Sequence, residues 1–295
     1  MSNVASVRKD VLVPFVFEHL PVRGAIVQLA DEWRALREGH DYSPELTEVL
    51  GHAAAATPLI AQSMKSGSSV TLQLTGKAPL SMLVMQSTND LEFRGLASAT
   101  QSTEGLSFAQ LTAGARCAIT VSNVNAERPY QGIVEVGGSA LANCLENYFL
   151  RSAQVPSYLS LIANDDVCAG LLLQQMPGER EPHGDDWRRL GFLAETLRSE
   201  DVIDGVGTGL LGKLFSEDDV RVFDPRAAVF RCRCSRLRAA NALKLLGEEE
   251  CELTDDDEDH IVVTCEYCGN RESFDPVDIA AIFAAGPQVS SPSVH

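Results

Sequence analysis

The chain has 295 residues, of which 45% are hydrophobic and 22% charged, as in a globular protein with one large and one small domain or with two medium ones. Its formal net charge of −17 argues against nucleic acid as a partner, because binding phosphates requires clustered Lys and Arg side chains. No apolar run reaches the roughly 18 residues of a transmembrane helix, and residues 1–10 lack the apolar stretch of a secretory signal. We therefore expect no membrane partner and a cytoplasmic location.

The segment 1–177 predicts an α/β or α+β domain. Short strand-like runs over 13–17 and 25–29 precede a helical pattern over 44–65, where Ser43 is suited to be the N-cap and Pro44 takes the first helical position. Later residues predict an amphipathic helix over 141–152 and strands over 70–74, 80–86, 116–121, 131–136 and 167–174.

A polar break over 177–186 indicates a domain boundary. Beyond this break, apolar residues recur at helical spacing, and four glycines separate them from a second short apolar patch. Two short helices interrupted in this way predict a weakly held helical linker over 178–231. An ordinary helical hairpin packed on the first domain fits the composition equally well. The apolar side chains of this segment that could cover a hydrophobic surface are Trp187, Leu190, Leu193, Leu197, Leu210 and Phe215.

The last part of the chain predicts a small domain over 232–285 and a disordered Ser/Pro-rich tail over 286–295. A helix is expected over 236–246, and a short strand over 261–264 leads into Cys265. Residues 232–295 carry 5 basic and 13 acidic side chains, the opposite of a zinc ribbon that grips DNA or RNA.

Five of the eight cysteines lie in this last part, and four of them are paired along the chain. Cys232-x-Cys234 forms the first pair, and Cys265-x-x-Cys268-Gly269 contains the second. Four thiolates can enclose Zn²⁺ tetrahedrally, and Gly269 can adopt the positive φ that a tight turn after Cys268 often needs. The spacing therefore predicts a zinc site formed by Cys232, Cys234, Cys265 and Cys268.

The unusual Cys232-x-Cys234 half of this pattern favours a redox switch over a purely structural site. A disulfide across it would close a very small ring, so it would be strained and easily reduced again. Oxidation of the four thiolates would expel zinc, and a small metal-dependent domain would then unfold.

The sequence Cys232-Arg-Cys234-Ser235, together with Val263-Thr-Cys265-Glu-Tyr-Cys268, resembles the zinc centre of the heat-shock protein 33 family, the redox-regulated chaperones. Departures from the family pattern are modest: Arg233 replaces Ser, Ala153 replaces Glu, and Cys251 is an extra thiol. The resemblance covers essentially the whole chain in collinear order, through Val22–Gly24, Gly39–Tyr42, Asn89–Leu91, Arg94–Gly95, Tyr130–Val134, Leu145–Phe149 and Phe223–Arg226.

The resemblance implies an ATP-independent holdase rather than an enzyme, with no catalytic residues. The reduced form would bind Zn²⁺ and be inactive. Oxidation would pair Cys232 with Cys234 and Cys265 with Cys268, release zinc and loosen the linker. The active form would be a homodimer and would bind unfolding client proteins, for which the apolar side chains of the linker, Trp187, Leu190, Leu193, Leu197, Leu210 and Phe215, are the candidates.

Two other classes of function remain open at this point. A thiol–disulfide oxidoreductase would use Cys265-x-x-Cys268, but it requires that motif at a helix N-terminus beside a βαβ unit. A purely structural zinc ribbon that docks a partner protein would keep its zinc under peroxide.

Overall fold

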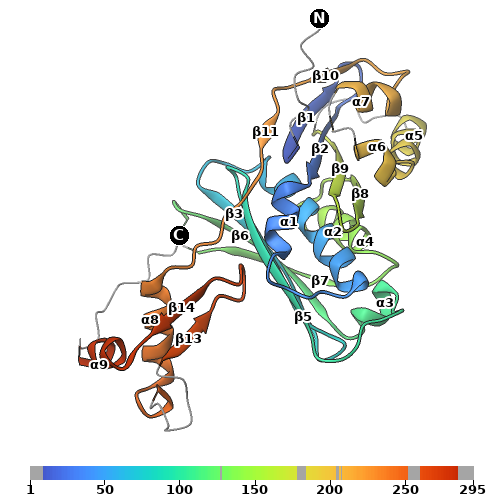
Figure 1. The fold of residues 1–295 in the computed structure, drawn as a ribbon. Coiled ribbons are helices and arrows are strands. Elements are labelled where there is room, and N and C mark those ends of the chain that lie inside the picture. The colour runs from blue at the N-terminus through green and yellow to red at the C-terminus, as the bar shows by residue number, and fades with distance from the viewer. Residues whose placement is uncertain are drawn as a thin grey trace, which may run out of the picture. The chain divides into compact units, whose positions relative to one another are not determined.

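The computed structural model describes residues 9–126, 128–177, 184–203, 206, 208–251 and 260–284 (Figure 1). The chain divides into two compact units. The first spans the chain up to Arg231 except for Glu38–His40, and the second comprises that short segment and Cys232–His295. The expected tail over 286–295 lies outside the described residues, and the boundary expected near residue 177 stays a prediction.

Sheet A of the first unit is antiparallel, in the strand order β10-β1-β2-β9-β8, with β11 also paired to β1. Its central strands are apolar on both faces, as expected for a sheet covered on both sides. Leu12, Val27 and Leu172 face one core, while Phe15, Ile26 and Leu171 face another. The strands are β1 (Val11–Phe17), β2 (Val22–Leu29), β8 (Ser157–Ala163), β9 (Cys168–Gln175), β10 (Val220–Val222) and β11 (Arg226–Ala227).

Sheet B has the order β12-β5-β4-β3-β6-β7 and is antiparallel except for the parallel pair β12–β5. Along β3 the side chains of Val70, Leu72 and Leu74 are buried, and the residues between them are more exposed. This alternation turns one face of the sheet toward the core. The strands are β3 (Ser68–Thr75), β4 (Leu80–Thr88), β5 (Glu92–Ala99), β6 (Arg116–Asn123), β7 (Tyr130–Glu135) and β12 (Val229–Phe230).

Helix α2 (Pro44–Ala61) contacts strands of both sheets and is buried along most of its length. Ser43 caps it by accepting a hydrogen bond from Leu46 N at 3.2 Å, as the sequence predicts. Its run of alanines allows the strands to approach closely from both sides. The smaller helices are α1 (Asp31–Arg37), α3 (Phe108–Leu111) and α4 (Leu141–Tyr148), which continues as one π-helical turn, Phe149–Ala153, where the sequence predicts a single helix.

Three helices, α5 (Gly184–Glu195), α6 (Ser199–Ile203) and α7 (Thr208–Leu214), cover the second face of sheet A (Figure 1). We call them the cover helices. Leu190 and Leu210 of these helices, together with Leu197 and Phe215 just beyond α5 and α7, pack against the side chains of β1, β2 and β9. The Phe215 ring lies 5.1 Å from that of Phe17, edge to face. The strands β10, β11 and β12 that follow α7 were not predicted from the sequence.

The second unit is small. Helices α8 (Arg236–Leu246) and α9 (Pro276–Ala284) and the hairpin of β13 (Ile261–Thr264) and β14 (Arg271–Phe274) surround its core. Among its described residues, that core contains only four buried side chains, Leu243, Cys251, Phe274 and Ile279. Among the described helices of both units, none combines the length and apolarity needed to cross a bilayer.

Candidate metal centre

The two cysteine pairs of the second unit lie in two different backbone settings. Cys232 and Cys234 lie in the segment before α8, while Cys265 and Cys268 lie in the turn between β13 and β14. In that turn Gly269 N donates to Cys265 O at 2.9 Å, and Cys265 N donates to Asn270 O at 2.8 Å. Gly269 has a φ of 67°, as the sequence predicts, because a residue with a Cβ is strained there. The turn thus directs both thiols to one side.

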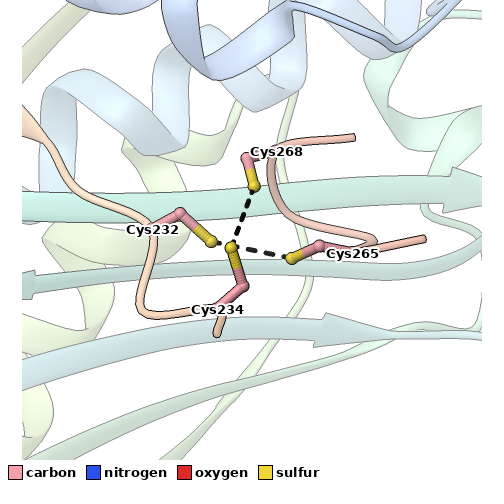
Figure 2. Close-up of side chains that lie close together, drawn as sticks. All are labelled: Cys232, Cys234, Cys265 and Cys268. Atoms are coloured by element: carbon pink, nitrogen blue, oxygen red, sulfur yellow. Dashed lines mark hydrogen bonds between the residues drawn. The ribbon is translucent and has the colours of Figure 1, made fainter. Parts of the chain in front are cut away.

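The four sulfur atoms point toward one another and all lie within 4.8 Å (Figure 2). Two of the separations are 3.6 Å, between Cys232 and Cys265, and 3.4 Å, between Cys234 and Cys268. A disulfide would require about 2.05 Å, so all four are free thiols. A tetrahedral site with Zn–S bonds of about 2.3 Å has sulfur atoms about 3.8 Å apart. The cluster therefore has the donor type and the size that suit Zn²⁺.

Burial and mutual contact oppose ionisation of Cys234 and Cys268. Burial raises the pKa of Cys268 well above its usual value, and hydrogen bonds with the neighbouring thiols raise it further. Burial likewise raises the pKa of Cys234. Burial also acts to raise the pKa of Cys232, but hydrogen bonds from Cys234 N and the other thiols outweigh it and lower this pKa. A dication at the centre would stabilise the thiolates together and remove this conflict.

Arg236 holds the elements around the cluster together. Its guanidinium donates to Ser273 O at 2.7 Å and to Asp278 Oδ2 at 2.7 Å, and it lies 4.3 Å from the centre of the Phe274 ring. The first residue of α8 is thereby tied to β14 and α9. Because Ser235 also caps α8 through Arg238 N, the residues that follow Cys234 have a fixed conformation.

The remaining cysteines lie apart from the cluster. Cys251 is 3% exposed in the core of the second unit. Cys117, Cys144 and Cys168 are fully buried in the first unit, where they pack in its apolar core. Burial raises the pKa of Cys117 to about 12 and also raises the pKa of Cys168, so these thiols are poor nucleophiles.

The predicted cover residues come together in one cluster in the first unit. Leu190, Leu197, Leu210 and Phe215 are buried there, and Trp187 and Leu193 are partly buried against them. Sequence reasoning missed the surface beneath them. The sequence of β1 could have revealed this surface, because Val11, Val13, Phe15 and Phe17 form an apolar row on the face of the strand opposite Leu12.

Known proteins resemble this chain along most of its length. The sequence model described as "Hsp33 protein" matches residues 10–275. The 33 kDa chaperonin of Shewanella loihica is 36% identical over 284 residues, covering 96% of this chain and 99% of the relative. The 33 kDa chaperonin of Nitrosococcus oceani is 38% identical over 284 residues, which cover 96% of this chain and 97% of the relative. The crystal structure of the 33 kDa chaperonin from Thermotoga maritima has the same fold, with a TM-score of 0.77 at 22% identity over 93% of this chain and 98% of that one.

Proposed function

The chain belongs to the Hsp33 family, and from this premise we propose that it is a redox-regulated, ATP-independent holdase that binds unfolding proteins when it is oxidised. The observation that carries the proposal is the cluster of four free thiols within 4.8 Å in a unit whose described residues form only a small apolar core. Such a unit depends on a bound metal for its stability, so chemistry at the thiols controls its folding.

In the reduced form, Cys232, Cys234, Cys265 and Cys268 would hold Zn²⁺. The ion would supply a cross-link between the segment before α8 and the β13–β14 turn, in addition to the contacts of Arg236. The protein in this state would be inactive as a chaperone.

Oxidation removes two electrons from each pair of thiols. With hydrogen peroxide, two thiols and one peroxide give one disulfide and two waters, so two peroxides oxidise the whole site. The disulfides proposed are Cys232–Cys234 and Cys265–Cys268. The close sulfur contacts in the structure, 3.6 Å between Cys232 and Cys265 and 3.4 Å between Cys234 and Cys268, run across the two motifs. The thiols would therefore have to change partners as zinc leaves. Disulfide mapping of the oxidised protein tests this pairing, and disulfides across the two motifs would contradict it.

The client-binding surface proposed is the second face of sheet A together with the inner faces of the cover helices. It includes Phe15, Phe17, Ile26, Leu171 and Leu173, all at most 4% exposed beneath those helices. Release of residues 184–214 would expose this apolar sheet, and exposed apolar surface binds other unfolded chains. The active form is proposed to be a cytoplasmic homodimer that binds unfolding proteins and neither nucleic acid nor membrane.

The setting of Cys265-x-x-Cys268 supports this proposal over an oxidoreductase. The motif lies in a hairpin turn between β13 and β14, whereas a redox enzyme of the CxxC type needs it at a helix N-terminus that lowers the thiol pKa.

One experiment tests the proposed function. Zinc-loaded, reduced protein is treated with peroxide at elevated temperature while zinc release is followed with a colorimetric chelator. Light scattering of a denaturing client is recorded in parallel. We expect suppression of aggregation only after zinc release, and reversal by dithiothreitol. Zinc retention, or equal protection by the reduced form, would contradict the switch, and rapid turnover in insulin reduction would favour an enzyme.

A further inference from the structure

Residues 226–231, which we call the strap, connect the cover helices and β10 to the first zinc-site cysteine. The chain passes from α7 through β10 and then runs along the first unit as β11 and β12 before it reaches Cys232 (Figure 1). Any loosening that starts at Cys232 and travels along the chain meets the strap before it meets the cover helices.

Backbone hydrogen bonds attach the strap to both sheets. In sheet A, Ala227 and Arg226 pair with Val11 and Leu12. In sheet B, β12 pairs in parallel with β5, and Arg231 N donates to Phe93 O at 2.8 Å. Ala228 N donates to Asp10 O and Val229 N to Leu91 O, at 2.9 and 3.0 Å. All of these acceptors belong to the first unit, so loss of zinc does not break them.

Side chains of the first unit add specific contacts to the strap. Glu32 Oε2 accepts a hydrogen bond from Phe230 N at 2.8 Å. Glu92 pairs with Arg231 at 2.7 Å, and Arg226 donates to Asn89 O. The Phe230 ring packs against the buried Phe93, with the ring centres 6.3 Å apart.

Glu32 is itself held in place for this contact. It lies in the first turn of α1, where Asp10 Oδ1 accepts hydrogen bonds from Ala30 N at 2.6 Å and Glu32 N at 3.0 Å. Asp10 adopts a φ of 63°, and its own carbonyl accepts from Ala228 N. One residue thus caps α1, positions Glu32 and binds the strap.

We propose that the strap is a latch, and that its docking by Glu32 sets how readily zinc loss frees the cover helices. This inference rests on the proposed function and concerns its regulation. While the latch is docked, loosening of the second unit stops at residue 231. When it detaches, β11 and β12 separate from the sheets, and the segment that leads back to α7 loses its attachment.

Hydrogen exchange of the full-length, zinc-loaded protein after peroxide treatment tests the latch. In Glu32→Ala, Phe230 N loses its acceptor, and we expect amides of 184–214 to lose protection roughly ten- to hundredfold faster than in the wild type, as for loss of one hydrogen bond to a charged group. Glu32→Gln keeps an acceptor oxygen and should restore most of the protection. Glu92→Ala should have a smaller effect because its ion pair is exposed to solvent.

Two controls separate the latch from general destabilisation. Glu48→Gln changes an exposed carboxylate of α2, and Ile119→Val weakens the buried core of sheet B. Both should open the cover helices at the wild-type rate. The rate of zinc release should be the same in all variants, because none alters a thiol.

Wild-type kinetics in Glu32→Ala, or equal acceleration in Ile119→Val, would overturn the latch. The proposed function is judged separately, by whether oxidised wild-type protein suppresses aggregation of the client. Exchange at 184–214 reports on the latch whichever way that assay turns out.

Discussion

At the scale of single residues, the five thiols of the second unit have different surroundings that assign them different roles. Four converge on one point, whereas Cys251 packs against Leu243 and the rest of the small core. The resemblance in sequence did not fix a role for this extra thiol. Its burial indicates that it fills space in the reduced protein and becomes available only when the core opens.

Removing Cys268 is expected to abolish tight zinc binding, whereas removing Cys251 is not. Cys268→Ala takes one of four ligands and should weaken zinc binding by more than the roughly hundredfold that loss of an outer-shell partner costs. Cys251→Ala should keep one zinc per chain and lose only some stability. Metal analysis after dialysis against a weak chelator measures both variants. Loss of zinc from Cys251→Ala would assign that thiol to the site.

His52 on α2 should make the first unit less stable in mild acid. Burial lowers its pKa to about 4, whereas an unfolded histidine titrates near 6.5. Between these values the unfolded chain binds more protons, so the free energy of unfolding falls as the pH falls. We expect a loss of about 1–2 kcal/mol from pH 7 to pH 5, less than full burial would give because the side chain is partly exposed. Urea denaturation at both pH values measures it.

The His52 contribution is identified by substitution. His52→Gln should reduce the difference in free energy of unfolding between pH 7 and pH 5 by this amount. His19→Gln should not remove this contribution, because His52 is still present. An unchanged difference in His52→Gln would show that other groups cause it.

At the scale of elements, the cover helices bury their apolar side chains on sheet A and leave Phe192 exposed. Phe192 is 67% exposed, whereas Phe215 is 1% exposed and contacts the rings of Phe15 and Phe17. These two phenylalanines form a matched pair for mutation, since Phe192 lies in α5 and Phe215 directly follows α7, and they differ in what they contact.

Phe215→Ala should open the cover helices in the reduced protein without releasing zinc. Truncation of a buried phenylalanine costs about 3–5 kcal/mol, which is large for three short helices. We expect increased binding of a hydrophobic dye and basal suppression of client aggregation, with one zinc retained. Phe192→Ala should behave as the wild type. Equal dye binding by both variants would show that the second face of sheet A is not what opens.

Elements with a strong local signal could be predicted from the sequence. The cap and proline at Ser43 and Pro44 gave the start of α2, and α8 and β13 have the predicted bounds. The very short strands β11 and β12 could not be predicted, because they are too short to show any periodicity and β12 pairs with β5, which is distant in the sequence. The cysteine spacing predicted the candidate ligands, but the docking of Phe230 by Glu32 depends on the tertiary fold.

At the scale of the whole molecule, the two units differ in what stabilises them. The first has two extensive apolar cores around sheet A and α2, and the described part of the second has four buried side chains. The first unit can therefore stay folded when the second does not.

Chelation of zinc should unfold the second unit and leave α2 and sheet B folded. Structural zinc binding is worth about 10–16 kcal/mol in small zinc peptides, far more than four buried side chains supply. In the presence of a strong chelator and a reductant, we expect the amides of 236–251 and 260–284 to lose protection from hydrogen exchange. The amides of α2 and sheet B should keep theirs. Thermal unfolding should then still show a transition from the core around α2. Persistent protection over 236–251 without zinc would contradict a metal-dependent unit.

With zinc bound as proposed, the small core of the second unit would also link the reduced state to the supply of metal. A ligand that binds only the folded form adds stability that depends on its free concentration, so each tenfold fall in free zinc above the dissociation constant removes about 1.4 kcal/mol. A unit with a large core would be indifferent to such changes. This one would lose its fold through zinc depletion as well as through oxidation, and Cys251, released from beside Leu243, would then become accessible to alkylating reagents.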